Sequence, residues 1–460
     1  MHSIHRNLFP FHISLLLLIA SCNQNAEHTT DITFSKDIAP IIYKKCTACH
    51  RPGEAGSFPL LTYQDVTSRS KLIKFVTQSR FMPPWPADAA YTHFIDENVL
   101  SEDEIQQIAT WVDQGCKQGD STQLPPLPFF PTGSQLGKPD LVIKLRDVYP
   151  IKGNGKDQFL LMRVPYEIPR DTFIRVIEIV PDNRKLVHHV NAHLLSYDFN
   201  KRKDVFKGNT VVDLEQFPDK LSAYKKLDLA NDDGLTFPTL TQSVANYLPG
   251  VVPPVYPAGI GGYVMTRKGA IFLKDIHYGP SRLDTTDQTT FNVFYAHTPS
   301  RRPLQEFQMG TYGVSPTVPA LVIPPDTVMT FHSDFRLPFD ISVLTINPHM
   351  HLLGRSFLAY AVTIQQDTIP LIRINKWDFR WQYFYTFKKM VKIPEGAIIH
   401  TEGVFDNTRH NPNNPFSPPR LVAEREGSMR TSDEMFQFIV TYLPYQSGDE
   451  QISLEANNSN

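Results

Sequence analysis

The sequence predicts a multidomain fold in which a small α-helical domain is followed by two all-β, jelly-roll-like β-sandwich domains. Three observations lead to this prediction. The chain has 460 residues, and at about 150 residues a domain this length suggests three units. A proline-rich linker at 121–137 separates a helical pattern from a long region of short β-branched runs. The 38 prolines of the chain suit sandwiches with many turns better than helical bundles.

Residues 1–22 are predicted to be a lipoprotein signal peptide. A basic start at Arg6 precedes a short apolar run, which ends in the lipobox-like Ile19-Ala20-Ser21-Cys22. This run is shorter than the roughly 20 residues that a membrane-spanning helix needs. We therefore expect lipidation of Cys22 and a lipid-anchored protein of the bacterial cell envelope, on the periplasmic or cell-surface side. The alternative is a plain cleaved signal with an incidental cysteine.

The unit at 31–120 has a helical pattern. Ser101 followed by Glu104 forms a capping box, which predicts a helix running through Trp111. The same unit contains a C-x-x-C-H run, which is the attachment motif for a c-type haem. This run is Cys46-Thr47-Ala48-Cys49-His50.

In such a motif the thiols of Cys46 and Cys49 bind the haem covalently, and His50 is the proximal iron ligand. Half of a zinc site is the alternative, but the four cysteines of the chain include no second pair to complete four thiolates. We therefore expect one haem c in a cytochrome c-like domain that transfers electrons. Export agrees with this expectation, because c-type haem is attached outside the bacterial cytoplasm.

The opposite face of the haem iron needs a second ligand. Met82, in a proline-rich stretch, is the only methionine between the haem motif and the linker. A thioether there would give His/Met iron, which favours electron transfer over oxygen chemistry. His93 is the competing ligand, and Met82 could instead be simple core packing.

Cys116 is left over after the lipid and haem assignments, so no internal disulfide is expected and the thiol is predicted to be inert and partly buried. The formal net charge is −2, and no basic patch with interleaved aromatic residues stands out. Both features argue against a nucleic-acid partner.

The β region divides into a first sandwich at 138–298 and a second at 299–446. The polar stretch 198–238 is predicted to be a surface loop or short helices, and 447–460 a disordered tail. The predicted strands lie at 140–145, 173–180, 185–195, 271–278, 290–295, 321–323, 341–346, 357–364, 398–405 and 436–443.

Ten of the sixteen histidines lie in this β region. The i, i+2 spacing of His349 and His351 places both imidazoles on one face of a strand, where they can share a metal. His188 and His189 are adjacent, so one metal can accept both only at a twist, a bulge or a strand end. A single strand histidine such as His277 is by itself more often structural.

Together these residues resemble an ordered set of motifs. The set consists of His188-His189, the His277-Tyr278-Gly279 run, His349-x-His351 and Asp433-Glu434-Met435. It resembles the copper type II, ascorbate-dependent monooxygenases, the family of peptidylglycine alpha-hydroxylating monooxygenase and dopamine beta-monooxygenase. The resemblance spans roughly 138–444 and divides between the two sandwiches as the two β-domains of that family do.

This resemblance implies two copper ions. His188, His189 and His277 would bind the electron-accepting copper, and His349, His351 and Met435 the oxygen-activating one, which makes the second set catalytic. Ligand chemistry also favours copper, because imidazole binds copper strongly and a thioether selects its reduced state over zinc. His193, Met429 and His410 stay unassigned.

The sequence departs from the family in several places. Animal members are rich in disulfides, which this chain cannot form. Peptide-processing members carry an arginine two residues before the His-x-His pair, where this chain has Asn347, so a peptide carboxyl terminus is not supported as substrate. Phe436 follows the methionine in place of cysteine, and the segment 406–415 is similar to a bacterial branch with a preceding cytochrome c domain.

The resemblance implies a monooxygenase that hydroxylates an aliphatic C–H bond of an unidentified small molecule with O2. The fused haem domain would feed electrons to the copper sites, supplied in turn by an unidentified periplasmic donor. One alternative is an envelope electron-transfer or copper-binding protein without hydroxylase activity. A structural lipoprotein with a degenerate copper fold is another.

Overall fold

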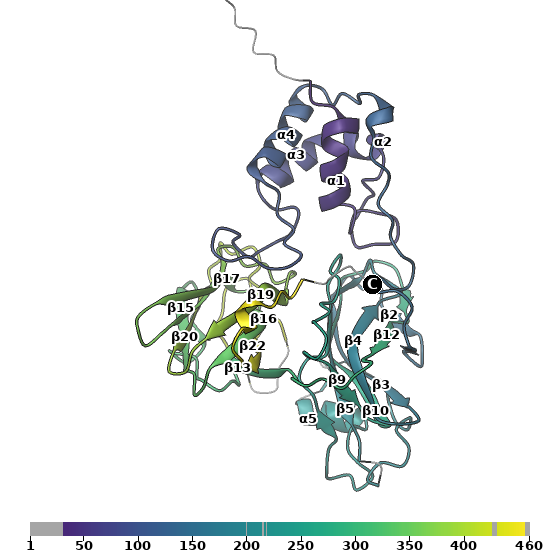
Figure 1. The fold of residues 1–460 in the computed structure, drawn as a ribbon, viewed down its shortest axis with the longest axis vertical. Coiled ribbons are helices and arrows are strands. Elements are labelled where there is room, and N and C mark those ends of the chain that lie inside the picture. The colour runs from purple at the N-terminus through teal and green to yellow at the C-terminus, as the bar shows by residue number, and fades with distance from the viewer. Residues whose placement is uncertain (1–30, 199, 214–215, 218, 426–429, 456–460) are drawn as a thin grey trace, which may run out of the picture.

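The structure, a computed structural model, describes residues 31–198, 200–213, 216–217, 219–425 and 430–455. The predicted signal peptide with Cys22, and also Met429, lie outside the described residues. Three units make up the described chain, with the helical domain placed at one end, over both β units (Figure 1). Among the described residues, no helix is both long and apolar enough to cross a membrane.

The helical domain has a small core around Trp111, which is fully buried. Its longest helix begins with the predicted capping box, in which Ser101 and Glu104 bond to each other's backbone N–H groups. The elements are the π-helical turn Phe34–Ile38, α1 (Ala39–Lys45), α2 (Tyr63–Thr67), α3 (Ser70–Gln78), α4 (Glu102–Asp113) and the 3-10 turn Ser121–Gln123.

Part of this domain packs away from its own core. Phe94 is 1% exposed, yet it belongs to the apolar core of the second sandwich, as does Ala87. Ala87 forms an isolated β-bridge with Ile374, and Phe94 forms one with Phe387. The loop after α3 is therefore docked on the second sandwich, with one bridge to each of its two sheets.

The first sandwich pairs a sheet of order β1-β12-β4-β9 with one of order β6-β3-β10-β5-β7, in which β8 also pairs with β5. Its core lies between the sheets. The strands are β1 (Leu141–Lys144), β2 (Tyr149–Ile151), β3 (Gln158–Glu167), β4 (Thr172–Val180), β5 (Val187–Ser196), β6 (Val211–Asp213), β7 (Thr239–Leu240), β8 (Ala245–Tyr247), β9 (Tyr263–Met265), β10 (Lys268–Tyr278), β11 (Thr285–Asp287) and β12 (Thr290–Tyr295).

The polar stretch 198–238 contains one short helix, α5 (Lys220–Lys226), as expected, but it is more than a surface excursion. Val205, Ala223 and Leu227 are fully buried in a cluster that packs against the outer face of the sheet. Arg202 is buried with them and donates to Asp228 Oδ2 at 2.8 Å. The charged residues of this stretch therefore cover a small second core.

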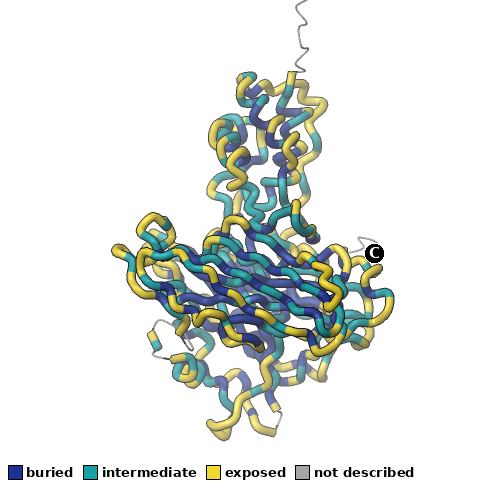
Figure 2. Tube along the Cα trace, turned by 90° about the vertical axis from the view of Figure 1, so that its left-hand side faces the viewer, coloured by how far each residue is buried: buried dark blue, intermediate teal, exposed yellow. Residues whose placement is uncertain are grey.

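The second sandwich pairs a sheet of order β13-β22-β16-β19 with one of order β15-β20-β17-β18. Buried residues run in rows through these sheets, and exposed ones gather at the loops (Figure 2). The strands are β13 (Gln305–Gly310), β14 (Val322–Ile323), β15 (Val328–Arg336), β16 (Ile341–Met350), β17 (Gly354–Val362), β18 (Thr368–Ile374), β19 (Tyr385–Ile393), β20 (Ile398–Asp406), β21 (Val422–Ala423) and β22 (Phe436–Pro444).

The prediction of a disordered tail at 447–460 is wrong for the described part, 447–455. A 3-10 turn, Asp449–Gln451, follows β22. Arg302 Nη1 lies 2.6 Å from Asp449 Oδ1 in a largely buried ion pair, and Leu454 is 1% exposed. The polar composition of the tail predicted disorder, because it gave no sign of the Arg302–Asp449 ion pair or of the burial of Leu454.

Candidate metal centres

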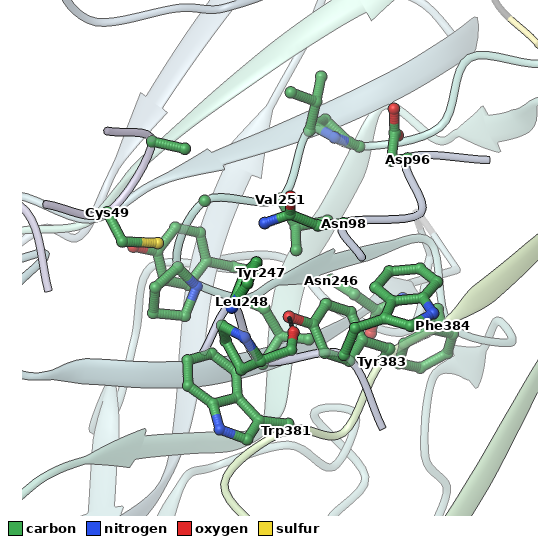
Figure 3. Close-up of a pocket in the computed structure, with 18 of the residues that line it drawn as sticks. Cys49, Asp96, Asn98, Asn246, Tyr247, Leu248, Val251, Trp381, Tyr383 and Phe384 are labelled. Atoms are coloured by element: carbon green, nitrogen blue, oxygen red, sulfur yellow. Dashed lines mark hydrogen bonds between the residues drawn. The ribbon is translucent and has the colours of Figure 1, made fainter. Parts of the chain in front are cut away.

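The C-x-x-C-H run lies at the end of α1, where Cys46 is the C-cap residue. Cys46, Cys49 and His50 line a cavity of about 480 Å³ that is mostly apolar. Side chains of both sandwiches complete its wall, among them Tyr247 and Trp381 (Figure 3). The haem motif therefore faces the β units and not bulk solvent.

The residues of this cavity fit a c-type haem. His50 Nδ1 donates to the Phe58 carbonyl oxygen at 3.0 Å, which fixes the tautomer and leaves Nε2 as the ligand atom. Burial lowers the pKa of His50, so the ring is neutral as an iron ligand must be. Both cysteines are free thiols, and burial raises the pKa of Cys46 to about 12 and that of Cys49 to about 11.

The two candidate sixth ligands lie in different surroundings. Met82 lines the cavity with the haem motif. The side chain of His93 is 62% exposed, lies 3.1 Å from Glu97 Oε2 through Nδ1, and is not part of the cavity wall. The structure thus brings Met82, and not His93, to the haem motif.

The first histidine set is built on a β-bulge. In the β5–β10 ladder His189 faces His277, but the next residue of β10, Tyr278, faces Val187. His188 is the extra residue, and such a bulge lets two adjacent side chains turn to the same side. The ring centroids of His188 and His189 lie 4.7 and 5.0 Å from that of His277.

Two carboxylates hold the outer nitrogens of this set. His189 Nε2 lies 2.8 Å from Asp275 Oδ2, and His277 Nε2 lies 2.7 Å from Asp157 Oδ1. Carboxylate partners of this kind orient metal-binding histidines. Gly279 makes room for the third ring, because a Cβ there would lie 2.4 Å from His188 Nε2.

The inner nitrogens of this set have no partner. Nδ1 of His188, His189 and His277 are all buried without a hydrogen bond among the described residues. Buried polar atoms are seldom left unpaired, so three in one cluster need an explanation. Metal binding by these rings would explain the unpaired atoms, with His189 placed farther from the other two ligand positions than they are from each other. Burial and the neighbouring His277 lower the pKa of His188 to about 4, which keeps it neutral.

Asp157 was not singled out from the sequence. One ligand atom from each of Asp157, His188 and His277 lies within 4.8 Å of the others, whereas His189 falls outside this grouping. Because the Asp157 carboxylate already bonds to His277 Nε2, we assign it to orienting that ring. Its only sequence signal is its place directly before β3, the strand that faces His277 in register.

The second histidine set lies at the end of β16. The rings of His349 and His351 have centroids 5.0 Å apart, as the i, i+2 spacing predicts. His349 Nδ1 donates to Gln382 Oε1 at 2.7 Å, and His351 Nδ1 to the Asp433 carbonyl oxygen at 2.8 Å. Both rings therefore keep Nε2 free as a ligand. Burial and the neighbouring His351 lower the pKa of His349 to about 3.

Met435 is placed beside this pair by strand register. The β16–β22 ladder ends with Met350 opposite Phe436, so the next position brings Met435 across from His351. Glu434 is 1% exposed. Its carboxylate accepts the backbone N–H groups of His351 at 2.9 Å and Met435 at 3.2 Å, so it links the segments that carry these two residues.

One cleft joins the two sets. A cavity of about 800 Å³ between the sandwiches is lined by His189 and Asp275 on one side and by His349 and Met435 on the other. Lys220, Lys274 and amide side chains, Asn347 among them, complete its wall.

Phe379 lies between the sets, and no sequence pattern pointed to it. Its ring centroid is 6.3 Å from those of His189 and His277 and 5.7 Å from that of His351. The half-buried aromatic ring therefore packs against histidines of both sets. Its segment also supplies Gln382, the hydrogen-bond partner of His349.

Three unassigned residues fall outside both sets. His193 is 6% exposed, and its Nδ1 donates to the Thr241 carbonyl oxygen at 2.9 Å. His410 is exposed on a loop. Cys116 packs in the helical core, as expected for a structural thiol.

Comparison with known proteins supports the copper assignment for part of the chain. Residues 316–455 match the family model described as copper type II ascorbate-dependent monooxygenase, C-terminal domain. No curated protein matches the chain. This region contains His349, His351 and Met435, so the candidate ligands of the second set lie within the matched domain.

Among solved structures, two structures of infectious bursal disease virus are similar to parts of the chain. The VP2 subviral particle has 7% identity and a TM-score of 0.17, covering 68% of this chain and 73% of its own. The Gt strain structure has 11% identity and a TM-score of 0.14, covering 66% and 70%. Such TM-scores carry no argument about fold. The second sandwich is thus similar to the C-terminal domain of copper type II ascorbate-dependent monooxygenases.

Proposed function

We propose that this protein is a copper-dependent monooxygenase that hydroxylates an aliphatic C–H bond with O2, and that its helical domain binds haem c and feeds electrons to the copper sites. One observation carries the proposal. Three buried, unpartnered Nδ1 atoms lie together on one sandwich, and one of their rings, His189, lines a single cleft with His349 and Met435 of the other.

The residues divide the work. His188, His189 and His277 would hold one copper through Nδ1, and His349, His351 and Met435 would hold the other. Copper supplies the one-electron chemistry that O2 requires, and the thioether of Met435 favours the reduced ion. Neutral rings need no proton loss before they bind the metal. Phe379 would help to position the rings of both sets, because it packs against His189 and His351.

The cleft is the proposed substrate site. Asn347, which donates to the Tyr383 carbonyl oxygen at 2.9 Å, stands where an arginine would anchor a peptide carboxylate. A small molecule other than a peptide carboxyl terminus is therefore the proposed substrate. Cys22 remains the proposed lipid attachment point, and the cell envelope the proposed location.

Metal content tests the proposal. Protein matured with a c-type haem system should contain one iron and two coppers, and His188→Ala and His349→Ala should each lose about one copper. His193→Ala is the matched control and should keep both. Copper-loaded protein should then consume O2 only with substrate. Haem without stoichiometric copper would leave an envelope cytochrome and end the monooxygenase proposal.

A further inference from the structure

Two cavities described above share a wall. The haem-motif cavity and the cleft between the sandwiches are both lined by Asn246, Tyr247, Leu248 and Phe384. We call these four residues the shared wall. Three of them are consecutive, so a single segment of the first sandwich separates the two cavities.

This segment contacts the haem motif on one side. Gly250 follows it closely, and a Cβ at that position would lie 2.6 Å from Cys49 Sγ. Gly250 has a φ of +78°, which glycine adopts without strain. The turn after the shared wall therefore lies directly against one of the two thiols that would hold the haem (Figure 3).

The same segment contacts the first histidine set on the other side. Tyr247 ends β8, and in the β8–β5 ladder it lies opposite Val190, the residue that follows His189. The path from Cys49 to His189 thus crosses a short turn and one rung of a β-ladder.

We propose that the shared wall, with Tyr247 at its centre, is the electron route from the haem domain to the copper of the first histidine set. This inference rests on the proposed function. One electron moves per event, so Fe(II) becomes Fe(III) as Cu(II) becomes Cu(I), and no proton is transferred.

The surroundings of Tyr247 indicate whether its ring is oxidised during electron transfer or only bridges the two cavities. Its hydroxyl is buried and has no hydrogen-bond partner among the described residues. A tyrosine that is oxidised must lose its proton to an acceptor, and no described residue is hydrogen-bonded to this hydroxyl to take it. The ring therefore acts as a packed bridge and not as a radical, so the aromatic ring matters and the hydroxyl does not.

The test is a flash-reduction experiment on the full, haem- and copper-loaded protein without O2. A laser-driven photoreductant places one electron on the haem, and haem absorbance follows its reoxidation. Tyr247→Leu should slow reoxidation several-fold, whereas Tyr247→Phe should match the wild type. Tyr166→Leu is the matched control, because Tyr166 is also a buried tyrosine of the first sandwich with an unpartnered hydroxyl, yet it lines neither cavity.

The outcomes separate the inference from the proposed function. Haem and copper content, measured on every variant, must be unchanged for the rates to be compared. An unchanged rate in Tyr247→Leu would overturn the shared-wall route, as would slowing in Tyr166→Leu of equal size. If the wild-type haem stays reduced with both coppers present, the proposal that the haem domain feeds copper fails instead.

Discussion

At the scale of one residue, the position after His277 and Tyr278 must lack a side chain, and Gly279 occupies it. Its missing Cβ leaves the space that the His188 ring occupies, and without that space the bulge could not turn His188 toward its partners. Metal sites tolerate little displacement of a ligand, because coordination distances are fixed within about 0.2 Å.

We expect Gly279→Ala to displace His188 and weaken the first copper site while the His349 site stays filled. Copper titration followed by electron paramagnetic resonance would separate the two sites. Gly234→Ala controls for backbone strain away from the site, because Gly234 has open space around it but a φ of +68°. Full occupancy of both sites in Gly279→Ala would contradict this role.

At the scale of elements, the sequence predicted strands best where β-branched and aromatic residues dominate. The expected strand 290–295 is β12 (Thr290–Tyr295) in the structure. Strand β3 was missed, because its run of Leu and Met residues continues into Arg163 and Pro165, which weakens the strand signal. It also carries Arg163, which is fully buried and donates to the carbonyl oxygens of Val205 and Lys207.

The candidate site, too, was predicted only in part from the sequence. Motif spacing predicted the pairing of His349 with His351. For His188 and His189 the sequence argument required a twist, a bulge or a strand end, and the structure has a bulge. Phe379, Gln382 and Asp157 could not be predicted, because loop paths and strand register between distant segments bring them to the histidines. Local pattern carries no information about such contacts.

The C-terminal 3-10 turn is a stabilising element. Burial opposes ionisation of Asp449, but hydrogen bonds from Arg302 and Ser342 outweigh it and lower the pKa to about 2. A lowered pKa in the folded state stabilises the fold at pH values above the pKa of the unfolded chain. This stabilisation is lost as the pH falls through about 4 toward 2. Asp449→Asn should therefore cost about 2 kcal/mol of unfolding free energy at pH 7 and roughly half of that near pH 3. Denaturant unfolding measures the free energy of unfolding at both pH values. Glu450→Gln, a change at an exposed neighbour, is the control. An equal loss of stability at both pH values would refute the ion pair as the origin of the effect.

At the scale of the whole molecule, the helical domain is docked and not merely tethered. Glu54 Oε1 lies 2.7 Å from Arg184 of the first sandwich. Asp88 Oδ2 lies 2.7 Å from Arg373 of the second, and Phe94 is buried in its core. The haem motif is thus held against both β units, so a fixed electron route needs no search by a mobile domain.

This arrangement predicts that the linker is dispensable for domain contact once the protein has folded. The linker 121–137 is largely exposed, so a protease site introduced between Gln123 and Leu124 should be cleaved readily. After cleavage the helical fragment should still co-elute with the β units in size-exclusion chromatography, and haem reoxidation should keep its rate.

Phe94→Ala removes the buried anchor, which in a core costs about 3–5 kcal/mol, so the cleaved variant should separate into two species. Release of the helical fragment from the cleaved wild type would show that the linker, and not the docked surface, holds donor and acceptor together.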